Sequence, residues 1–199
     1  VDRAKETLTV KAQALKKVRV AAAPKLCDAV TKQMSHLQMG SAQIELNFED
    51  LPFEQWNKVG STKIELMYKP SAQMTARPLR KIASGGEVSR VMLACKVVLG
   101  ESDVCDTLVF DEVDAGVGGA TAVALAEVLA QLAKTHQVIV VTHLPQVAVM
   151  ASKQYVVSKT EEHNALPITS LTEVSGTQRE EEIARMLSGS ITEASLAHA

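Results

Sequence analysis

The sequence has few aromatic residues, few cysteines and no long apolar run, and each shortage excludes a class of protein. Aromatic residues make up only 3% of the 199 residues, which argues against stacking platforms for single-stranded bases. The three cysteines have no CxxC spacing, so we expect buried, reduced thiols in a cytosolic protein. No apolar run approaches the roughly 20 residues that a membrane-spanning helix needs. A formal net charge of -2 gives no global basic field for nucleic acid.

A phosphate-binding loop of the form G-x-x-x-x-G-K-[ST] is also missing, and no glycine is followed by lysine. In nucleotide-binding proteins the backbone of this loop and its lysine hold the phosphates. The stretch GVGGATA (116–122) is rich in glycine but has no such lysine, and we interpret it as a turn that leads into a helix. We therefore do not expect this chain to hold ATP tightly on its own.

The first 40 residues have a helical pattern. Residues 1–23 contain neither Gly nor Pro, and apolar residues recur there at helical spacing. Pro24 is expected to interrupt the pattern, so that residues 25–39 form a second helix that Gly40 closes. Two surface helices and the end of a coiled coil are both compatible with this segment.

The pattern then changes to a period of two. Apolar side chains alternate at Ile44, Leu46 and Phe48, and again over residues 63–69. This spacing predicts two antiparallel strands joined by a long loop. The prolines that follow predict a further loop over residues 69–83.

From residue 87 onward, helical and strand patterns alternate. Two short apolar runs, TLVF (107–110) and QVIVV (137–141), are typical of buried parallel strands. The alternation predicts an α/β fold with parallel strands in its core. We expect helices over 87–99, 119–135 and 145–151, a hairpin from 154–159 and 168–174, and a last amphipathic helix over 179–187.

The stretch KIASGGEVSR (81–90) places Gly85 and Gly86 at the start of a helix. A helix start leaves about four backbone N–H groups unpaired and carries partial positive charge. Glycine has no side chain to keep an anion from these donors, and Ser84 adds a hydroxyl. The site therefore suits a phosphate. A simple turn in which Ser84 caps the helix is the alternative.

Polar residues follow both predicted parallel strands. Asp111 and Glu112 come directly after TLVF, and Thr142 and His143 come directly after QVIVV. Ligands of parallel sheets bind at the carboxyl ends of strands. We therefore expect these two pairs of polar residues and the helix start at Gly85 to lie along one edge of the sheet. One carboxylate can hold Mg²⁺ and the other can accept a proton from water, while the histidine can donate to a phosphate. Taken singly, a solvated acidic loop and a structural histidine remain open.

The order of these motifs resembles the second half of an ABC-type ATPase. The order is ASGGE, then an apolar strand followed by DE, then an apolar strand followed by TH. They correspond to its signature motif, Walker B motif and switch histidine. The strings PLRKIASGGEVSRVMLACKVVL, TLVFDEVDAGVGG and VIVVTHLPQVA further resemble the RecN family of bacterial DNA repair proteins, which are relatives of SMC (structural maintenance of chromosomes) proteins. The resemblance is dense over residues 77–160. It implies the C-terminal lobe of an ABC/SMC-type P-loop ATPase head over residues 41–199, with residues 1–40 as the end of a coiled-coil arm.

The resemblance also implies a role for each motif residue. Asp111 would serve Mg²⁺, Glu112 would orient and deprotonate the hydrolytic water, and His143 would sense the terminal phosphate. The implied contacts with ATP come from Ser84, Gly85, Gly86, Glu87, Asp114 and Gly116. Of these, the signature residues would reach ATP on the opposing protomer, and the loop 114–118 would cross the dimer interface.

Members of this family carry the phosphate-binding loop in an N-terminal lobe, so the resemblance implies a C-terminal piece that is inactive alone. The implied partners are its own N-terminal lobe, a second copy joined through ATP, and DNA, in the cytoplasm at the nucleoid and without a membrane. Two departures weaken particular contacts: Ala83 replaces the usual leucine, and Gly118 replaces the aspartate of SMC relatives. The alternatives are a head of another SMC-like or ABC-type ATPase, and a scaffold of the same fold that does not hydrolyse ATP.

Overall fold

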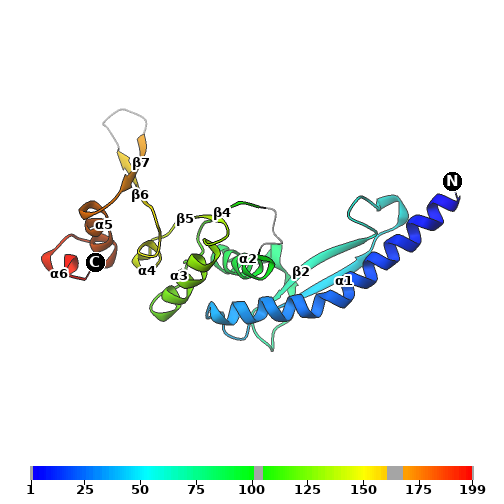
Figure 1. Ribbon diagram of the computed structural model, residues 1–199. Coiled ribbons are helices and arrows are strands. Elements are labelled where there is room, and N and C mark those ends of the chain that lie inside the picture. Colours follow the sequence, from blue (N-terminus) through cyan, green and yellow to red (C-terminus); the bar gives the residue numbers. More distant parts are fainter. Residues whose placement is uncertain (1, 101–104, 161–167, 199) are drawn as a thin grey trace. The chain divides into compact units, whose positions relative to one another are not determined.

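The computed structural model describes residues 2–100, 105–160 and 168–198 (Figure 1). The chain divides into two compact units, residues 1–104 and 105–199. Among the described residues, no helix combines the length and the apolar character needed to span a membrane. The first unit contains α1 (Asp2–His36), β1 (Gln43–Asp50), β2 (Thr62–Lys69), β3 (Arg77–Pro78) and α2 (Gly85–Leu99), with short 3-10 turns at Phe53–Gln55 and Leu79–Lys81.

Helix α1 is continuous through Pro24, so the predicted break into two helices is wrong. Proline has no N–H to donate to the carbonyl of Val20 and normally ends or kinks a helix. Tertiary packing overrides this preference, because α1 lies against both β1 and α2. Buried side chains stand on both sides of the proline: Ala12 and Ala23 before it, Val30 and Met34 after it.

The first half of α1 is fastened to the β1–β2 hairpin by its basic side chains. The ammonium of Lys16 lies 2.6 Å from a carboxylate oxygen of Asp50. The guanidinium of Arg19 donates to the carbonyl of Val59 at 2.8 Å. The ammonium of Lys5 lies 4.6 Å from the ring centroid of Phe53. These contacts explain why α1 belongs to the same compact unit as the strands. That it is the end of a coiled-coil arm stays a prediction.

Strands β1 and β2 are antiparallel, as predicted, and a long loop joins them. Their register pairs Leu46 with Leu66 and Phe48 with Ile64, so the alternating apolar residues of both strands share one face. Strand β3 adds a short third strand beside β2 within the segment that was predicted to be a loop. The hairpin thereby gives α1 a sheet surface to lie on.

The second unit contains the predicted parallel strand pair. Its elements are β4 (Thr107–Phe110), α3 (Ala120–Leu132), β5 (Gln137–Val140), α4 (Pro145–Ala148), β6 (Gln154–Thr160), β7 (Ile168–Val174), α5 (Thr177–Ser188) and α6 (Glu193–Leu196). Strands β4 and β5 pair in parallel, with Thr107 opposite Gln137 and Phe110 opposite Val140. Both polar strand ends therefore come out at the same edge.

The burial of these strands differs from the prediction. Leu108 and Phe110 are buried, but Val109 is 66% exposed and Ile139 is 47% exposed. Successive side chains of a strand point to opposite faces, and the described residues of the second unit cover only one face of this strand pair. The expectation of strands buried on both sides is therefore wrong for this chain.

The end of the chain agrees with the sequence pattern in most respects. Strands β6 and β7 form the predicted antiparallel hairpin. Helix α5 ends at Gly189, whose φ of 76° is a left-handed conformation that suits glycine. A further short helix, α6, follows, so α5 is not the last helix.

We predict that Pro24→Ala stabilises the protein. The alanine N–H can donate to the carbonyl of Val20, and alanine is the better helix former, so the free energy of unfolding should rise by about 1–3 kcal/mol. Urea unfolding followed by circular dichroism measures this change. Val20→Ala, which leaves the proline in place, is the control. A less stable Pro24→Ala variant would mean that α1 needs its proline.

The three cysteines are free thiols, and we predict that they react at different rates. Cys105 is exposed, and Cys27 and Cys95 are partly exposed, which corrects the expectation that all three are buried. Burial raises the pKa of the Cys95 thiol to about 11, so at pH 8 only about one thiol in a thousand is ionised. Since the thiolate is the reactive form, iodoacetamide should modify Cys105 far sooner than Cys95, as measured by mass spectrometry. Both should react alike in urea. Equal rates in the folded protein would contradict the packing of α1 on α2.

Candidate functional site

The start of α2 is built as the signature stretch predicts. Ser84 has extended backbone, and its Oγ accepts a hydrogen bond from the Glu87 N–H at 3.3 Å. The Val88 N–H donates to the Ser84 carbonyl at 3.2 Å. Ser84 therefore caps the helix, as the simpler alternative requires. Within the described part of the chain, the N–H groups of Gly85 and Gly86 have no such acceptor, so the cap leaves two donors at the helix start.

The loop after β4 turns sharply at Glu112. Asp111 and Glu112 are exposed, whereas the next two residues, Val113 and Asp114, are buried. The φ of Glu112 is 56°, in the left-handed region. For a residue with a Cβ this conformation costs about 1–2 kcal/mol, and such strain gathers at functional sites. No residue pattern in the sequence predicts the left-handed backbone of Glu112.

Gly116 belongs to the same loop and has a φ of 71°. The loop is closed by two backbone hydrogen bonds, from the Ala115 N–H to the Glu112 carbonyl and from the Val117 N–H to the Asp114 carbonyl. Gly116 lies inside the second of these turns, and a position with left-handed backbone there favours glycine. The geometry thus gives Gly116 a role in the turn, and its predicted contact with ATP stays a prediction.

Asp114 joins the loop after β4 to the loop after β5. The Thr142 hydroxyl donates to its Oδ2, the His143 backbone N–H donates to the same oxygen at 3.0 Å, and His143 Nδ1 lies 3.1 Å from it. The hydroxyl of Thr142 in turn accepts from the Leu144 N–H at 3.0 Å. The side chain of Asp114 is only 4% exposed, while that of His143 is 70% exposed. The acidic loop and the histidine are thus brought together, with the histidine ring at the surface.

The segment that carries His143 is also held at its far end. The guanidinium of Arg179, on α5, donates to the carbonyls of Ala148, Val149 and Ala151 at 3.2, 3.1 and 2.7 Å. These carbonyls lie at the last residue of α4 and directly after it, where backbone acceptors of a helix end need partners from elsewhere. Neither the contacts of Arg179 nor the buried position of Asp114 was predicted from the sequence, because neither follows from a local pattern.

The predicted site residues fall into two groups. Asp111, Glu112, Asp114 and His143 lie at the ends of β4 and β5 in the second unit. The stretch 84–87 begins α2 in the first unit. The expectation that these groups meet along one edge stays a prediction.

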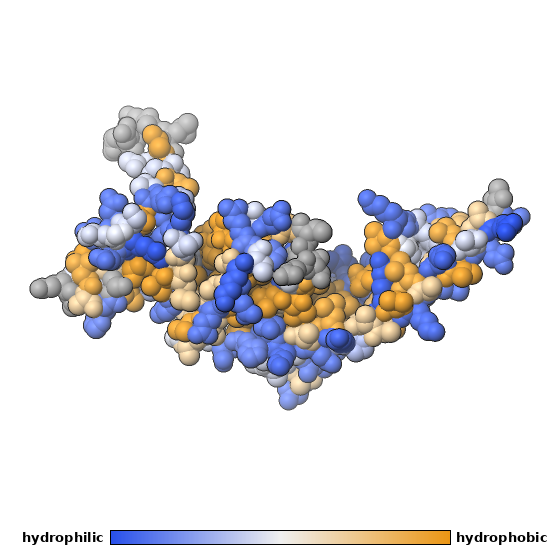
Figure 2. Space-filling model, viewed as in Figure 1, coloured by the Kyte–Doolittle hydropathy of each residue, from blue (hydrophilic) through white to orange (hydrophobic). Residues whose placement is uncertain are grey.

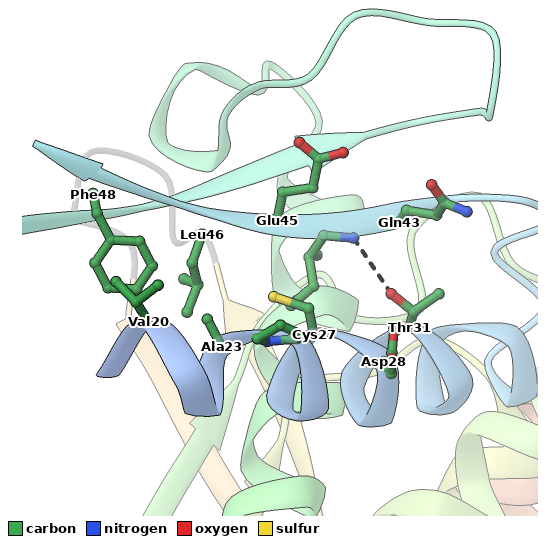
Figure 3. A pocket seen from close by; sticks show the side chains of 11 residues that line it. Val20, Ala23, Cys27, Asp28, Thr31, Gln43, Glu45, Leu46 and Phe48 are labelled. Atoms are coloured by element: carbon green, nitrogen blue, oxygen red, sulfur yellow. Dashed lines mark hydrogen bonds between the residues drawn. The ribbon is translucent and has the colours of Figure 1, made fainter. Parts of the chain in front are cut away.

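A groove of about 470 Å³ lies between α1 and β1 in the first unit (Figure 3). Ala23, Leu46 and Phe48 are among its apolar residues, and Asp28 and Glu45 are also among the residues that line it. None of the predicted site residues lines this groove. Pro24 also lines the groove, which carries no catalytic set of residues.

The acidic loop is compatible with a magnesium ion that binds together with a nucleotide. Over residues 2–100, 105–160 and 168–198, no three His, Cys, Asp or Glu side chains gather into a metal cage. Mg²⁺ in nucleotide sites is usually held by one or two carboxylates and by phosphate oxygens. Asp111, exposed at the end of β4, is a donor of that kind.

Comparisons with known proteins agree with the motif resemblance. The chain is 40% identical over 188 residues to DNA repair protein RecN of Streptomyces coelicolor, covering 89% of this chain and 33% of that protein. It is 42% identical over 187 residues to DNA repair protein RecN of Deinococcus radiodurans, covering 94% and 32%. The chain thus spans about a third of the length of these relatives. No protein-family model matches it.

The chain also resembles solved structures of SMC proteins in fold. One comes from work on ATP-driven dimerization and DNA-stimulated activation of SMC ATPases; it has a TM-score of 0.52 at 19% identity and covers 86% of this chain and 97% of that one. Another is the Smc head domain with a coiled coil and joint from Pyrococcus yayanosii, with a TM-score of 0.56 at 18% identity, covering 83% and 29%. At such identities the likeness shows the fold alone, which is that of an SMC-type ATPase head, as predicted. The relatives at about 40% identity narrow this further, and the chain belongs to the RecN family of bacterial DNA repair proteins, of whose length it spans about a third.

Proposed function

We propose that this chain is the C-terminal half of an ATPase head that binds and hydrolyses ATP between two copies, in the repair of DNA double-strand breaks and recombination. The observation that carries the proposal is the junction at Asp114. It fastens an acidic loop and a histidine together at the same end of two parallel strands. This is where nucleotides bind in parallel α/β sheets.

The acidic loop and the histidine that Asp114 brings together supply three residues with roles in the proposed reaction. Asp111 would hold Mg²⁺, which would supply neutralisation of the phosphate charge. The carboxylate of Glu112 orients the attacking water and accepts its proton. His143 contacts the terminal phosphate with its exposed ring and stabilises the charge that develops there. Water attacks the terminal phosphorus, the bond to the bridging oxygen breaks, and ADP and phosphate leave.

The start of α2 supplies the contact with the second copy. Gly85 and Gly86 present backbone N–H groups at a helix N-terminus, where a phosphate is favoured. We propose that these donors, with Ser84 and Glu87, close over ATP held by the opposing head. Binding then joins the heads, and hydrolysis by Glu112 releases them.

An N-terminal lobe of the same protein is the proposed source of the missing phosphate-binding loop. The exposed apolar side chains of Val109 on β4, Ile139 on β5 and Val141 directly after β5 support this partner, because a parallel sheet is normally covered on both faces. Exposed apolar side chains on α1, such as Leu8 and Val18, likewise support a partner helix in a coiled-coil arm. Figure 2 shows apolar surface along α1.

DNA is the proposed partner of the whole protein, in the cytoplasm at the nucleoid. The names of the relatives support it. So does the division of charge, since residues 1–104 contain 16 Lys and Arg against 11 Asp and Glu, a formal net of +5. Residues 105–199 contain 5 against 12, a net of -7. The total net charge of -2 is therefore the sum of a basic unit, which can attract phosphates, and an acidic unit.

We predict that Glu112→Gln, in the longer protein that includes the phosphate-binding loop, slows ATP hydrolysis by about a hundredfold or more. The amide keeps the shape of the side chain but cannot accept the proton. ATP-driven dimerisation, measured by light scattering, should persist because the phosphate contacts remain. Glu127→Gln, an exposed change of equal charge on α3, is the control. Turnover at the wild-type rate would remove Glu112 from this role.

We also predict that Glu112→Gly is more stable than Glu112→Ala by about 1 kcal/mol, since only glycine adopts a φ of 56° without cost. Chemical denaturation of the two variants measures the difference. At Ala133, whose φ is -66°, Ala133→Gly should be destabilising by about 1 kcal/mol. The sign of the glycine effect should thus reverse between the two positions. An alanine variant at 112 as stable as the glycine variant would mean that the loop relaxes without strain.

A further inference from the structure

We propose that Asp114 is a positioning residue, which acts on its own His143 and fixes the direction and the tautomer of that ring. The inference rests on the proposed function of His143. It gives Asp114 a different role from the direct contact with ATP that the family resemblance implies.

The contacts of the Asp114 carboxylate are directed at His143. One oxygen, Oδ2, accepts from the backbone N–H of His143 at 3.0 Å and lies 3.1 Å from Nδ1 of the same residue. The carboxylate therefore holds the backbone of His143 by a hydrogen bond and lies within ion-pair distance of its ring. The hydroxyl of Thr142 donates to the same oxygen and keeps it in place. With 4% of its side chain exposed, Asp114 is directed to these donors and not to solvent.

The chemistry of the contact decides which ring nitrogen is free. An ionised carboxylate can only accept hydrogen bonds, so it favours a proton on the Nδ1 that lies 3.1 Å from its oxygen. In the neutral ring, Nε2 is then the nitrogen without a proton. In the doubly protonated ring, Nε2–H is the donor that remains. In both states Nδ1 is engaged by Asp114 and Nε2 is left for a ligand.

The exposure of the two side chains separates their roles. The His143 ring is 70% exposed and can meet a phosphate. Asp114 is covered, so it influences the ligand through the histidine. A partner carboxylate that sets the tautomer and the orientation of a histidine is a recurring device in active sites.

A first experiment tests the tautomer without any nucleotide. The 199-residue chain is labelled with ¹⁵N-histidine and its imidazole nitrogens are observed by long-range NMR correlation, at a pH where the rings are neutral. We expect a protonated Nδ1 for His143 in the wild type. In Asp114→Asn this preference should be lost, while His136, whose Nδ1 lies 2.8 Å from the Thr135 hydroxyl, should not change. A wild-type His143 protonated at Nε2 would overturn the proposal without any variant.

A second experiment tests the consequence for turnover, in the longer protein with its phosphate-binding loop. Asp114→Asn should lower kcat by about tenfold to a hundredfold, because a small displacement of a catalytic group has effects of that size. KM for ATP should stay within about threefold. Asp106→Asn, an exposed change of equal charge before β4, is the matched control and should leave both constants unchanged.

A double variant separates positioning from general stability. If Asp114 acts through His143, then Asp114→Asn combined with His143→Ala should turn over no more slowly than His143→Ala alone. Additive losses would mean that Asp114 acts elsewhere, and would overturn the proposal. If His143→Ala itself has no effect on turnover, the proposed function of His143 fails, while the tautomer measurement still decides whether Asp114 fixes the ring.

Discussion

The site in the second unit depends on one buried carboxylate oxygen. The parallel ladder between β4 and β5 continues to the hydrogen bond from the Val141 N–H to the Phe110 carbonyl, and beyond it the two loops need another connection. Oδ2 of Asp114 provides it through Thr142 and His143. A buried charge is costly unless it is hydrogen-bonded, and these donors satisfy it. Thr142 and His143 donate to this carboxylate, and the same hydrogen bonds fix the position of His143 in the candidate site.

The strain at Glu112 and the burial of Asp114 are two parts of one loop geometry. The chain leaves the end of β4 with two exposed carboxylates and must then bury Val113 and Asp114 within two residues. A left-handed residue reverses the chain over such a short distance, and the structure has one at Glu112. Glycine would form this turn at lower cost, but it has no carboxylate. The strain is consistent with retention of the acid for its chemistry.

The sequence predicted those features that depend on short-range patterns. The alternation around Leu46 and Leu66 gave the correct faces of an antiparallel pair, and the two apolar runs gave the parallel strands. Features set by tertiary contacts were not predictable in this way. Pro24 lies within a helix because the segments on both sides of it are buried against other elements. Asp114 looked like a loop residue, and only the packing of the next strand's loop beside it shows that it is buried.

The exposed apolar side chains of the second unit lie on the same two strands that carry the candidate site. Val109 and Ile139 face away from the buried side of β4 and β5, in strands whose composition suits burial on both faces. The same two strands end at the acidic loop and at His143. A segment that covered this face would therefore also come close to the edge where the phosphates of a nucleotide are proposed to lie. Because this chain has no phosphate-binding loop of its own, completing the sheet and completing the nucleotide site are the same structural requirement in the proposed head.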